Sequence, residues 1–436
     1  MKRVLLKYTL ILTVGFFLFI AQQSVADNWP TWRGPHANGV CDESNIANTW
    51  SKTKNVRWRL ELPGQAGSTP VIWEDKIFLT TVGNNNEDLL LMCIGTDGTA
   101  RWKKKLGTGN RDVRRGEGNS ASPSPCTDGQ HVWAYFSTGD IGCYDFDGNQ
   151  IWKGNLEKWY GEFNMYFVMA SSPIVDGNRL YLQLIHSNIR NKDDKTAGLV
   201  LALDKLSGKE IWAHERQSDA HSECEHSYAS PFLYRDNEQE FLLSHGADYV
   251  SAHSLSDGSE IWRCGGLNLK DRYNPSLRFV ASPAAVPGLI VVPSAKNGPV
   301  LGLNPNAKGN ITDTDEGHIW RRDDNTPDVP SPLIHDGLVY LCRENGVLIC
   351  IDAQTGEEIY QQRTHNNRHR ASPVYADGKI YLTSRDGLVT VVKAGRKFEI
   401  LAQNDINETI ASSPAISNGA IYLRSYQALY SIRNSQ

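Results

Sequence analysis

The chain has 436 residues, of which 40% are hydrophobic and 22% are charged, with 37 glycines and 19 prolines. This composition is typical of a folded protein and excludes disordered, collagen-like and polytopic membrane chains. The formal net charge is −4 and the basic runs are short and isolated, so we expect no nucleic-acid partner. Short apolar runs broken by Asp-Gly, Ser-Gly and Asn-Gly pairs favour hairpins over helices, and we predict an all-β protein.

The first 26 residues have the layout of a signal peptide. Two basic residues, Lys2 and Arg3, precede an almost wholly apolar run over residues 9–21, and small residues follow at 24–26. The apolar run is shorter than the ~20 residues that a membrane-spanning helix requires. No cysteine stands directly after the expected cleavage site before Asp27. We therefore expect a periplasmic or secreted protein with no membrane span and no lipid anchor at this site.

Residues 27–55 form the next segment, which has no strand periodicity. They contain Trp29, Trp32 and Trp50, whose large apolar rings gain stability when they are buried. We expect this segment to be an extended arm that packs on the rest of the protein.

A repeat organises residues 56–436. A serine or threonine followed by proline precedes an apolar run eight times, at Thr69-Pro70, Ser122-Pro123, Ser172-Pro173, Ser230-Pro231, Ser282-Pro283, Ser331-Pro332, Ser372-Pro373 and Ser413-Pro414. Successive prolines are 41 to 58 residues apart, which is the range of propeller blades. Each copy has room for four strands separated by turns. We predict a single eight-bladed β-propeller of four-stranded blades.

A second signal within the copies is a glycine four residues before an aromatic residue. The pairs are Gly98 with Trp102, Gly148 with Trp152, Gly208 with Trp212, Gly258 with Trp262 and Gly356 with Tyr360. Glycine suits a turn between the third and fourth strands because it tolerates positive φ. The large apolar indole can dock across the seam between neighbouring blades. We predict a structural role for this stripe rather than a cofactor-stacking one.

The eighth copy stops after three strands, of which the last is predicted at residues 428–432. Residues 56–60 lie upstream of the first copy and contain Trp58, which matches the positions of Trp102 and Trp152. We predict that this N-terminal strand completes the last blade and closes the ring, because closure removes an exposed sheet edge.

The repeat Ala202-Leu203-Asp204 with Gly208 and Trp212 resembles the pyrroloquinoline-quinone (PQQ) repeat of the quinoprotein alcohol dehydrogenase-like propellers. The resemblance covers residues 56–432, and the opening Trp29-Pro30-Thr31-Trp32-Arg33-Gly34-Pro35 is similar to the start of secreted propellers with this repeat. This superfamily includes quinone-dependent dehydrogenases and non-catalytic scaffolds, so the resemblance implies the fold and does not choose the function. PQQ and calcium are the cofactors that it implies.

The cysteine pattern differs from that of the quinone-dependent dehydrogenases, which carry adjacent cysteines, calcium ligands and an Asp base. This chain has no Cys-Cys pair. Cys93, Cys143 and Cys350 occupy one repeat position that other copies fill with Ala or Gly, so we predict that they are packing residues. Cys224 and Cys264 lie in successive inter-blade connections, where an oxidising compartment permits a disulfide.

Two histidine groups have no recognised metal-ligand spacing. They are His221 with His226, and His365 with His369, and the expected strand and loop context does not place either pair on one face. We expect solvated or hydrogen-bonded roles for them, no metal site and no catalytic residue.

The Ser-Pro strand is predicted to be the innermost of each blade, so the residues just before it line one mouth of the central channel, where propellers hold ligands. The candidate ligand-binding residues there are Glu117, Asn119, His226, Arg278, Asp328, His369, Arg370 and Glu408. Their mixed charges fit a polar small molecule, a glycan or a protein segment. They also fit a hydrated pore entrance, which is the simpler interpretation.

Three functions stay open. The first, which we favour, is an extracytoplasmic, non-catalytic binding or assembly scaffold, because the repeats are complete and the catalytic signatures are missing. The second is a PQQ-dependent dehydrogenase with an atypical site. The third is a carbohydrate-binding or carbohydrate-acting propeller. In each case we expect a monomer.

Overall fold

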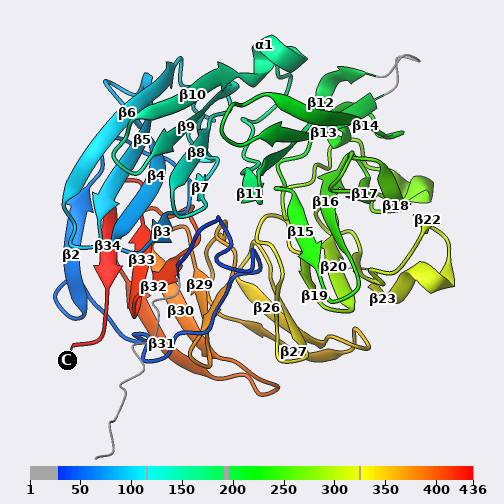
Figure 1. The fold of residues 1–436 in the computed structure, drawn as a ribbon. Coiled ribbons are helices and arrows are strands. Elements are labelled where there is room, and N and C mark those ends of the chain that lie inside the picture. Colours follow the sequence, from blue (N-terminus) through cyan, green and yellow to red (C-terminus); the bar gives the residue numbers. More distant parts are fainter. Residues whose placement is uncertain (1–27, 114–115, 191–195, 324–325, 436) are drawn as a thin grey trace, which may run out of the picture.

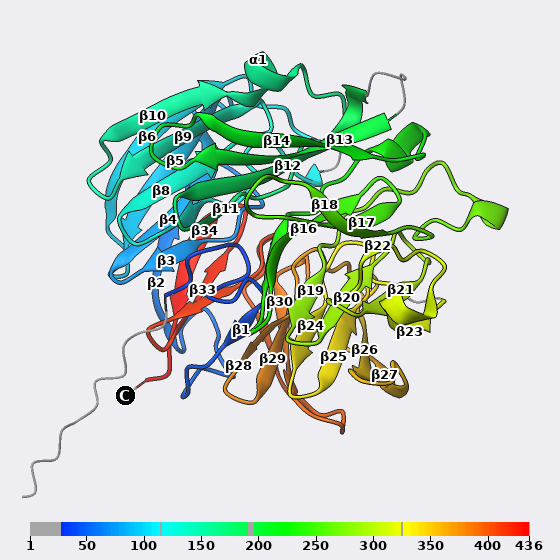
Figure 2. The same cartoon turned by 45° about the vertical axis from the view of Figure 1, so that its right-hand side comes forward.

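The computed structural model describes residues 28–113, 116–190, 196–323 and 326–435, so the expected signal peptide lies outside the described residues. Eight sheets are arranged in a ring, as Figure 1 and Figure 2 show from two directions. The all-β, eight-bladed propeller that the repeats predict is confirmed. Within the described ranges, no helix is long and apolar enough to cross a membrane.

Each blade has four antiparallel strands, and we number the blades 1–8 by their innermost strands along the chain. From inside to outside, blade 1 is β3 (Val71–Trp73), β4 (Lys76–Gly83), β5 (Asp88–Gly95) and β6 (Ala100–Thr108). Blade 2 is β7 (Cys126–Thr127), β8 (His131–Tyr135), β9 (Asp140–Asp145) and β10 (Gln150–Asn155). Blade 3 is β11 (Ile174–Asp176), β12 (Arg179–Arg190), β13 (Thr196–Asp204) and β14 (Glu210–Gln217). Blade 4 is β15 (Phe232–Arg235), β16 (Glu240–Gly246), β17 (Tyr249–His253) and β18 (Glu260–Cys264).

The second half of the ring repeats this order. Blade 5 is β19 (Ala284–Val286), β20 (Leu289–Pro293), β21 (Val300–Leu303) and β23 (His318–Arg322). Blade 6 is β24 (Leu333–His335), β25 (Leu338–Cys342), β26 (Val347–Asp352) and β27 (Glu358–Arg363). Blade 7 is β28 (Val374–Ala376), β29 (Lys379–Thr383), β30 (Leu388–Lys393) and β31 (Ile400–Asp405). Blade 8 is β32 (Ala415–Ser417), β33 (Ala420–Arg424), β34 (Ala428–Ile432) and β2 (Val56–Glu61).

A few short elements lie outside this pattern. β1 (Val40–Cys41) runs parallel to β28, and β22 (Gly309–Asn310) runs parallel to β18. The one α-helix of the described residues is α1 (Leu156–Tyr160), and 3-10 turns occur at Ser222–Glu225, Lys270–Arg272 and Asp315–Gly317.

A closed circle of hydrogen bonds joins the starts of the eight innermost strands. In each blade, the backbone N–H of the serine or threonine before the proline donates to the side-chain hydroxyl of the equivalent residue in the next blade. The circle runs through Thr69, Ser124, Ser172, Ser230, Ser282, Ser331, Ser372 and Ser413 and back to Thr69, with donor–acceptor distances of 2.9 to 3.2 Å. We call it the hydroxyl ring. The proline that follows each member carries no N–H, which suits an innermost strand because its N–H would face the channel without a partner.

The hydroxyl ring corrects one position of the predicted repeat. In blade 2 the member is Ser124, which precedes Pro125 and β7, and not Ser122. Ser122 instead exchanges hydrogen bonds with the backbone of Asn119. The sequence Ser-Pro-Ser-Pro offers two equivalent signals, and only the distance to the neighbouring blades distinguishes them.

Tryptophans of the stripe form hydrogen bonds across five of the eight seams between blades, whereas the buried indole N–H of Trp262 has no hydrogen-bond partner among the described residues. The indole N–H of Trp212, for example, donates to Leu255 O in blade 4 at 3.1 Å, and its ring lies against Gly258 of the same turn. Gly258 has φ +77, and a Cβ there would come within 2.5 Å of the ring. Equivalent indole-to-turn hydrogen bonds join Trp58 to Thr96, Trp102 to Phe146, Trp152 to Lys205 and Trp320 to Ala353. The predicted docking of indoles across the seams is therefore confirmed.

The N-terminal strand closes the ring. β2 pairs antiparallel with β34, with Arg59 opposite Tyr430, and becomes the outermost strand of blade 8. The predicted closure is confirmed, and the first and last described segments of the propeller are held in one sheet.

The segment before β2 crosses one mouth of the channel, where its dark-blue trace is seen near the centre of the ring (Figure 1). The guanidinium of Arg33 is buried and donates to the backbone oxygens of Pro332 and Pro373, each at 2.9 Å. This burial, without a carboxylate among its hydrogen-bond acceptors, lowers the pKa of Arg33 to about 9. Only about 20 Å³ of space remains between residues 31–37 and the serines of the hydroxyl ring. The segment thus fills this end of the channel, and its strand β1 is too short for the sequence to predict.

We expect Ser282→Ala to lower the free energy of unfolding by about 1–3 kcal/mol, because the buried N–H of Ser230 loses its acceptor. Ser282→Thr keeps the hydroxyl, as Thr69 does in blade 1, and should cost much less. Urea unfolding of the two variants measures the difference. Equal losses would contradict a stabilising role for the hydroxyl ring.

A second pair of variants tests the seams. Gly258→Ala and Gly288→Ala both place a Cβ at positive φ, but only the first meets an indole, since nothing lies within 4 Å at Gly288. We expect each to lose about 1 kcal/mol from backbone strain, and Gly258→Ala to lose about 1–3 kcal/mol more from overpacking against Trp212. Thermal unfolding measures both, and similar melting temperatures would argue against tight packing at the seam.

Candidate functional site

The two mouths of the channel are built from different parts of the blades. At one mouth the innermost strands end and turn into the second strands, and the segment before β2 covers this mouth. We call it the arm mouth. The opposite mouth is formed by the connections that lead into the innermost strands and by the turns between the second and third strands. We call it the Glu117 mouth, and all eight candidate residues precede innermost strands, which places them on this side.

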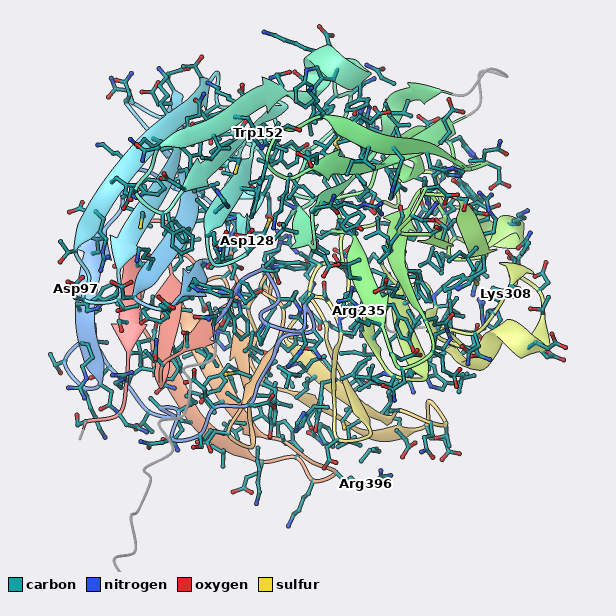
Figure 3. All side chains as sticks on the ribbon, in the orientation of Figure 1. Asp97, Asp128, Trp152, Arg235, Lys308 and Arg396 are labelled. Carbon is teal, nitrogen blue, oxygen red and sulfur yellow. The ribbon has the colours of Figure 1, made fainter. Side chains whose placement is uncertain are left out.

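The arm mouth keeps a groove of about 560 Å³ between residues 30–38 and the turns of blades 2 to 5. Asp128 and Arg235 contribute to its lining and lie toward the centre of the ring, whereas Lys308 and Arg396 lie at the rim (Figure 3). Both groove residues already have charged partners, since Lys205 binds Asp128 at 2.7 Å and Arg235 binds Asp176 at 3.1 Å.

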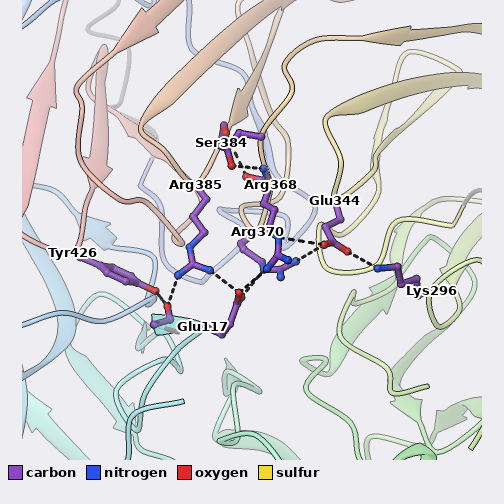
Figure 4. Close-up of polar contacts among 10 residues, drawn as sticks. Glu117, Lys296, Glu344, Arg368, Arg370, Ser384, Arg385 and Tyr426 are labelled. Atoms are coloured by element: carbon purple, nitrogen blue, oxygen red, sulfur yellow. Dashed lines mark hydrogen bonds and ion pairs between the residues drawn. The ribbon is translucent and has the colours of Figure 1, made fainter. Parts of the chain in front are cut away.

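At the opposite mouth, Glu117 is the centre of an ion-pair network (Figure 4). Its Oε1 accepts from Arg368 Nη1 at 3.0 Å and Arg385 Nη1 at 2.7 Å, and its Oε2 accepts from Arg370 Nε at 2.9 Å. We call Arg368, Arg370 and Arg385 the arginine cage. Glu117 lies in the connection between blades 1 and 2, whereas the cage belongs to blade 7, so the contact joins distant parts of the ring.

The electrostatics of Glu117 follow from this cage. Burial raises the pKa of its carboxyl, but the hydrogen bond from Arg370 and the charges of Arg370 and Arg385 outweigh burial, and the pKa lies below its usual value. The backbone is held as well, because Gly116 O accepts from Arg385 Nη2 at 2.8 Å and from the hydroxyl of Tyr426. Glu117 is therefore an ionised ligand of the three arginines.

A pair of carboxyl groups adjoins the cage. Asp328 is 8% exposed and hydrogen-bonds to Glu344, and Glu344 also binds Lys296 at 3.2 Å and Arg370 at 3.7 Å. Burial, followed by the hydrogen bond to Glu344, raises the pKa of Asp328 to about 6. Burial also acts to raise the pKa of Glu344, but the hydrogen bond from Asp328 and the charge of Arg370 lower it overall. Below about pH 6 the two carboxyls therefore share one proton, which Asp328 donates.

Three of the eight candidate residues meet in this network: Glu117, Asp328 and Arg370. Arg278 lies nearby, acts on Asp328 through its charge and binds Glu223 at 3.3 Å. Glu408 belongs to a separate cluster, because its carboxylate binds Arg59 on β2 at 2.9 Å and accepts hydrogen bonds from Ser425 and Tyr430.

The other three candidates are buried structural residues. Asn119 is 1% exposed and donates to Gln65 O, while its own oxygen accepts from the backbone of Ala121. His369 is fully buried with Nδ1 hydrogen-bonded to Asn367 O, and burial lowers its pKa to about 4. His226 is buried beneath the ring of Tyr166, at a centroid distance of 5.1 Å. None of the three presents a free polar group to the mouth at the surface.

Sequence reasoning missed Arg368, which lies two residues before Arg370, and four residues from the turns between second and third strands: Lys296, Glu344, Arg385 and Tyr426. A signal for three of them exists. Lys296, Glu344 and Arg385 each stand two residues before the glycine of the turn. The turn connects at the same mouth as the Ser-Pro connection, because the second strand runs back from the arm mouth.

Aromatic side chains occur along the connection between blades 2 and 3. Trp159 of α1 is 45% exposed and Tyr166 is 68% exposed. Phe163 packs on His186 at 5.1 Å, and the guanidinium of Arg278 lies 4.8 Å from the ring centroid of Phe167. An exposed aromatic surface therefore adjoins the charged network.

Cys224 and Cys264 are buried and not bonded to each other, so the disulfide that the sequence left open is not formed. Burial raises the pKa of Cys93 to about 12 and that of Cys350 to about 11, as expected of packing residues. Of the histidine groups, His221 stacks on Tyr273 at 4.3 Å and His365 binds Asp386 at 2.8 Å. In the described part of the chain, no three metal-ligating side chains cluster.

These residues do not fit a PQQ–calcium site. A calcium ion needs several open carboxylate or carbonyl oxygens, whereas the carboxylate of Glu117 is surrounded by three arginines that would repel a cation. Glu344 is bound by Lys296 and Arg370 in the same way. The mouth is arranged for anions rather than for a metal ion.

Comparisons with known proteins agree with the fold. A family model described as outer membrane protein assembly factor BamB, with PQQ repeats, matches residues 42–158, 93–289 and 247–436. The structure of BamB from Moraxella catarrhalis is 14% identical and covers 87% of this chain and 98% of its own, with a TM-score of 0.59. No curated protein sequence matches this chain. The resemblance to PQQ-repeat propellers is confirmed.

Two further solved structures share the fold. A europium-containing methanol dehydrogenase is 11% identical, with coverages of 92% and 90% and a TM-score of 0.66. Sqt1 from Saccharomyces cerevisiae is 10% identical, with coverages of 88% and 100% and a TM-score of 0.60. At such identities the likeness extends to the fold alone.

The carboxyl pair predicts a pH effect on stability. Because the pKa of Asp328 is about 6 in the folded protein and about 4 when unfolded, its ionisation opposes folding. The stability that it contributes is present below the unfolded pKa and is lost as the pH rises through 6. We expect Asp328→Asn to be more stable than the parent at pH 8 by about 1–3 kcal/mol, and the difference to shrink at pH 4.

Thermal unfolding at both pH values measures this difference. Glu408→Gln is the opposite control, because the pKa of Glu408 is lowered and its charge stabilises the fold above the unfolded pKa. Glu408→Gln should therefore lose stability at pH 8. An Asp328→Asn variant that is less stable than the parent at pH 8 would contradict the shared proton.

Proposed function

Because this chain belongs to the family described as outer membrane protein assembly factor BamB, we propose that it acts outside the cytoplasm as a non-catalytic scaffold that binds another protein. The observation that carries this proposal is the pairing of Glu117 with three arginines. A carboxylate that acts as a general acid or base must take up or release a proton. The carboxylate of Glu117 is instead ionised and held from several directions.

The exposed aromatic surface supports protein binding. Tyr166 is exposed, and its neighbour Phe167 packs against Arg278 at the Glu117 mouth. Tyr and Arg are among the residues that most often dominate binding at protein interfaces. The arm mouth is filled at its centre by residues 31–37. A partner would therefore approach from the Glu117 side.

Sequence features typical of exported proteins support a location outside the cytoplasm. The N-terminal sequence has the layout of a signal peptide, and burial of the thiols keeps them unreactive in an oxidising compartment. The periplasm or the exterior of the cell is where such a chain would act.

A photo-crosslinking amino acid tests this proposal. Placed at Tyr166, it should give a discrete protein adduct in the cells that make the protein. The matched control is Leu206, which is 48% exposed and lies in a turn at the arm mouth, where Lys205 N–H donates to Asn178 O. We expect no adduct from Leu206, and equal labelling from both positions would contradict a specific docking face.

A reconstitution assay tests the dehydrogenase alternative. The mature protein is incubated with PQQ and calcium, and dye reduction is followed with alcohols and aldose sugars. We expect no turnover, because the arginines around Glu117 leave no room for a cation. Turnover that is abolished by Glu117→Gln or Asp328→Asn would favour the dehydrogenase. Saturable binding of a sugar without turnover would favour the carbohydrate alternative.

A further inference from the structure

The arginine cage has more donors and more charge than its internal ligand uses. Each guanidinium carries five N–H donors, whereas the carboxylate of Glu117 accepts one hydrogen bond from each of the three arginines. Glu344 adds ion pairs of 3.8 Å to Arg368 and 3.7 Å to Arg370. Arg370 Nη1 is buried without a hydrogen bond, at 3.7 Å from Glu344. Arg368 is 53% exposed and can donate to an incoming group.

The local charge is positive. The four cations Lys296, Arg368, Arg370 and Arg385 face three carboxyl groups, those of Glu117, Glu344 and Asp328. Deeper in the channel, Arg424 is fully buried, and its Nε and Nη2 have no hydrogen-bond partner among the described residues. Its Nη1 donates only to backbone and hydroxyl oxygens of Ser68 and Thr80. Low surrounding dielectric strengthens the attraction of these cations for an anion.

The group already bound indicates the ligand class. The carboxylate of Glu117, which stands in a turn between two glycines, fits the cage with three charge-assisted hydrogen bonds of 2.7 to 3.0 Å. The planar fork of arginine matches the two oxygens of a carboxylate in geometry. A glutamate from another chain could make the same bonds.

We propose that the arginine cage binds a glutamate or aspartate side chain of an acidic segment in a partner protein, and that Glu117 occupies the cage until that carboxylate replaces it. This proposal rests on the proposed function and names its partner's chemistry. The exchange conserves ion pairs, because the carboxylate of Glu117 moves to water as the partner's carboxylate leaves water. In addition to this exchange of ion pairs, the net positive charge around the cage favours binding of the acidic segment.

Because Glu117 competes for the cage, its removal should raise the affinity of the cage for an acidic peptide. The probe is a fluorescent hexaglutamate peptide, and its binding to the mature protein is measured by anisotropy. Glu117→Gln should bind the probe about tenfold more tightly than the parent, because the internal carboxylate no longer competes. Arg368→Gln, at an exposed position of the cage, should bind it several-fold more weakly.

The matched control is Glu408→Gln, which removes a carboxylate that binds a single arginine, Arg59, outside the cage. Its affinity for hexaglutamate should equal that of the parent, and a hexaglutamine peptide should bind none of the proteins. If Glu408→Gln gains as much affinity as Glu117→Gln, only net charge matters and the proposal is overturned. The same holds if folded Glu117→Gln binds no more tightly than the parent.

Circular dichroism verifies the fold of each variant. Should Glu117→Gln fail to fold, Glu117→Asp replaces it, because this variant keeps the charge but shortens the side chain by one methylene. The proposal then requires that Glu117→Asp gain affinity for hexaglutamate in the same way. Competition by sulfate or by a polyuronate that exceeds competition by acidic peptide would overturn the choice of a peptide ligand. A Tyr166 crosslink that persists in Arg368→Gln would show that the scaffold role stands without the cage.

Discussion

The hydroxyl ring is the interaction on which the rest of this structure depends. Eight serine and threonine residues each use one backbone N–H and one side-chain oxygen, and the last donates to the first. Buried N–H groups at the centre of a propeller have no strand beside them, so an unpaired one would cost about 1–3 kcal/mol. A side chain longer than serine or threonine would not fit between strands that converge on one axis. The ring therefore fixes both the residue type and the orientation of every blade.

The fixed orientation of the blades decides what each mouth contains. Because all innermost strands start at the hydroxyl ring and run the same way, the inter-blade connections gather at the Glu117 mouth, and the first hairpin turns gather at the arm mouth. The segment before β2 then meets a surface of backbone oxygens, to which Arg33 donates. A guanidinium is suited to this position because it can satisfy several carbonyl groups at once. One end of the channel is filled in this way, and the other keeps its charged groups.

The charged groups of the network at the Glu117 mouth come from six connections and turns of the chain and become a site only when the ring closes. Glu117 is more than 250 positions from the arginines that bind it. An ion pair of this kind also ties the connection between blades 1 and 2 to blade 7, so it contributes to the shape of the mouth as well as to its charge. Its partial burial makes the pair stronger than one at an open surface, where screening leaves about 0–1 kcal/mol. The aromatic side chains beside it complete a surface with both apolar and cationic character.

The sequence by itself determined the fold, because strand starts, turn glycines and seam tryptophans are local signals that recur in every blade. It also determined that the strand with Trp58 would close the ring, since the eighth copy lacks one strand. Glu117, Asp328 and Arg370 were found because their position before a Ser-Pro pair places them at one mouth. Only the tertiary structure distinguished Ser124 from Ser122, since the choice depends on a distance to neighbouring blades. Only the tertiary structure also showed that Asn119 and His369 are buried and that Arg385 and Glu344 complete the network, because ion pairs between distant blades depend on how the ring closes and leave no periodic trace along the chain.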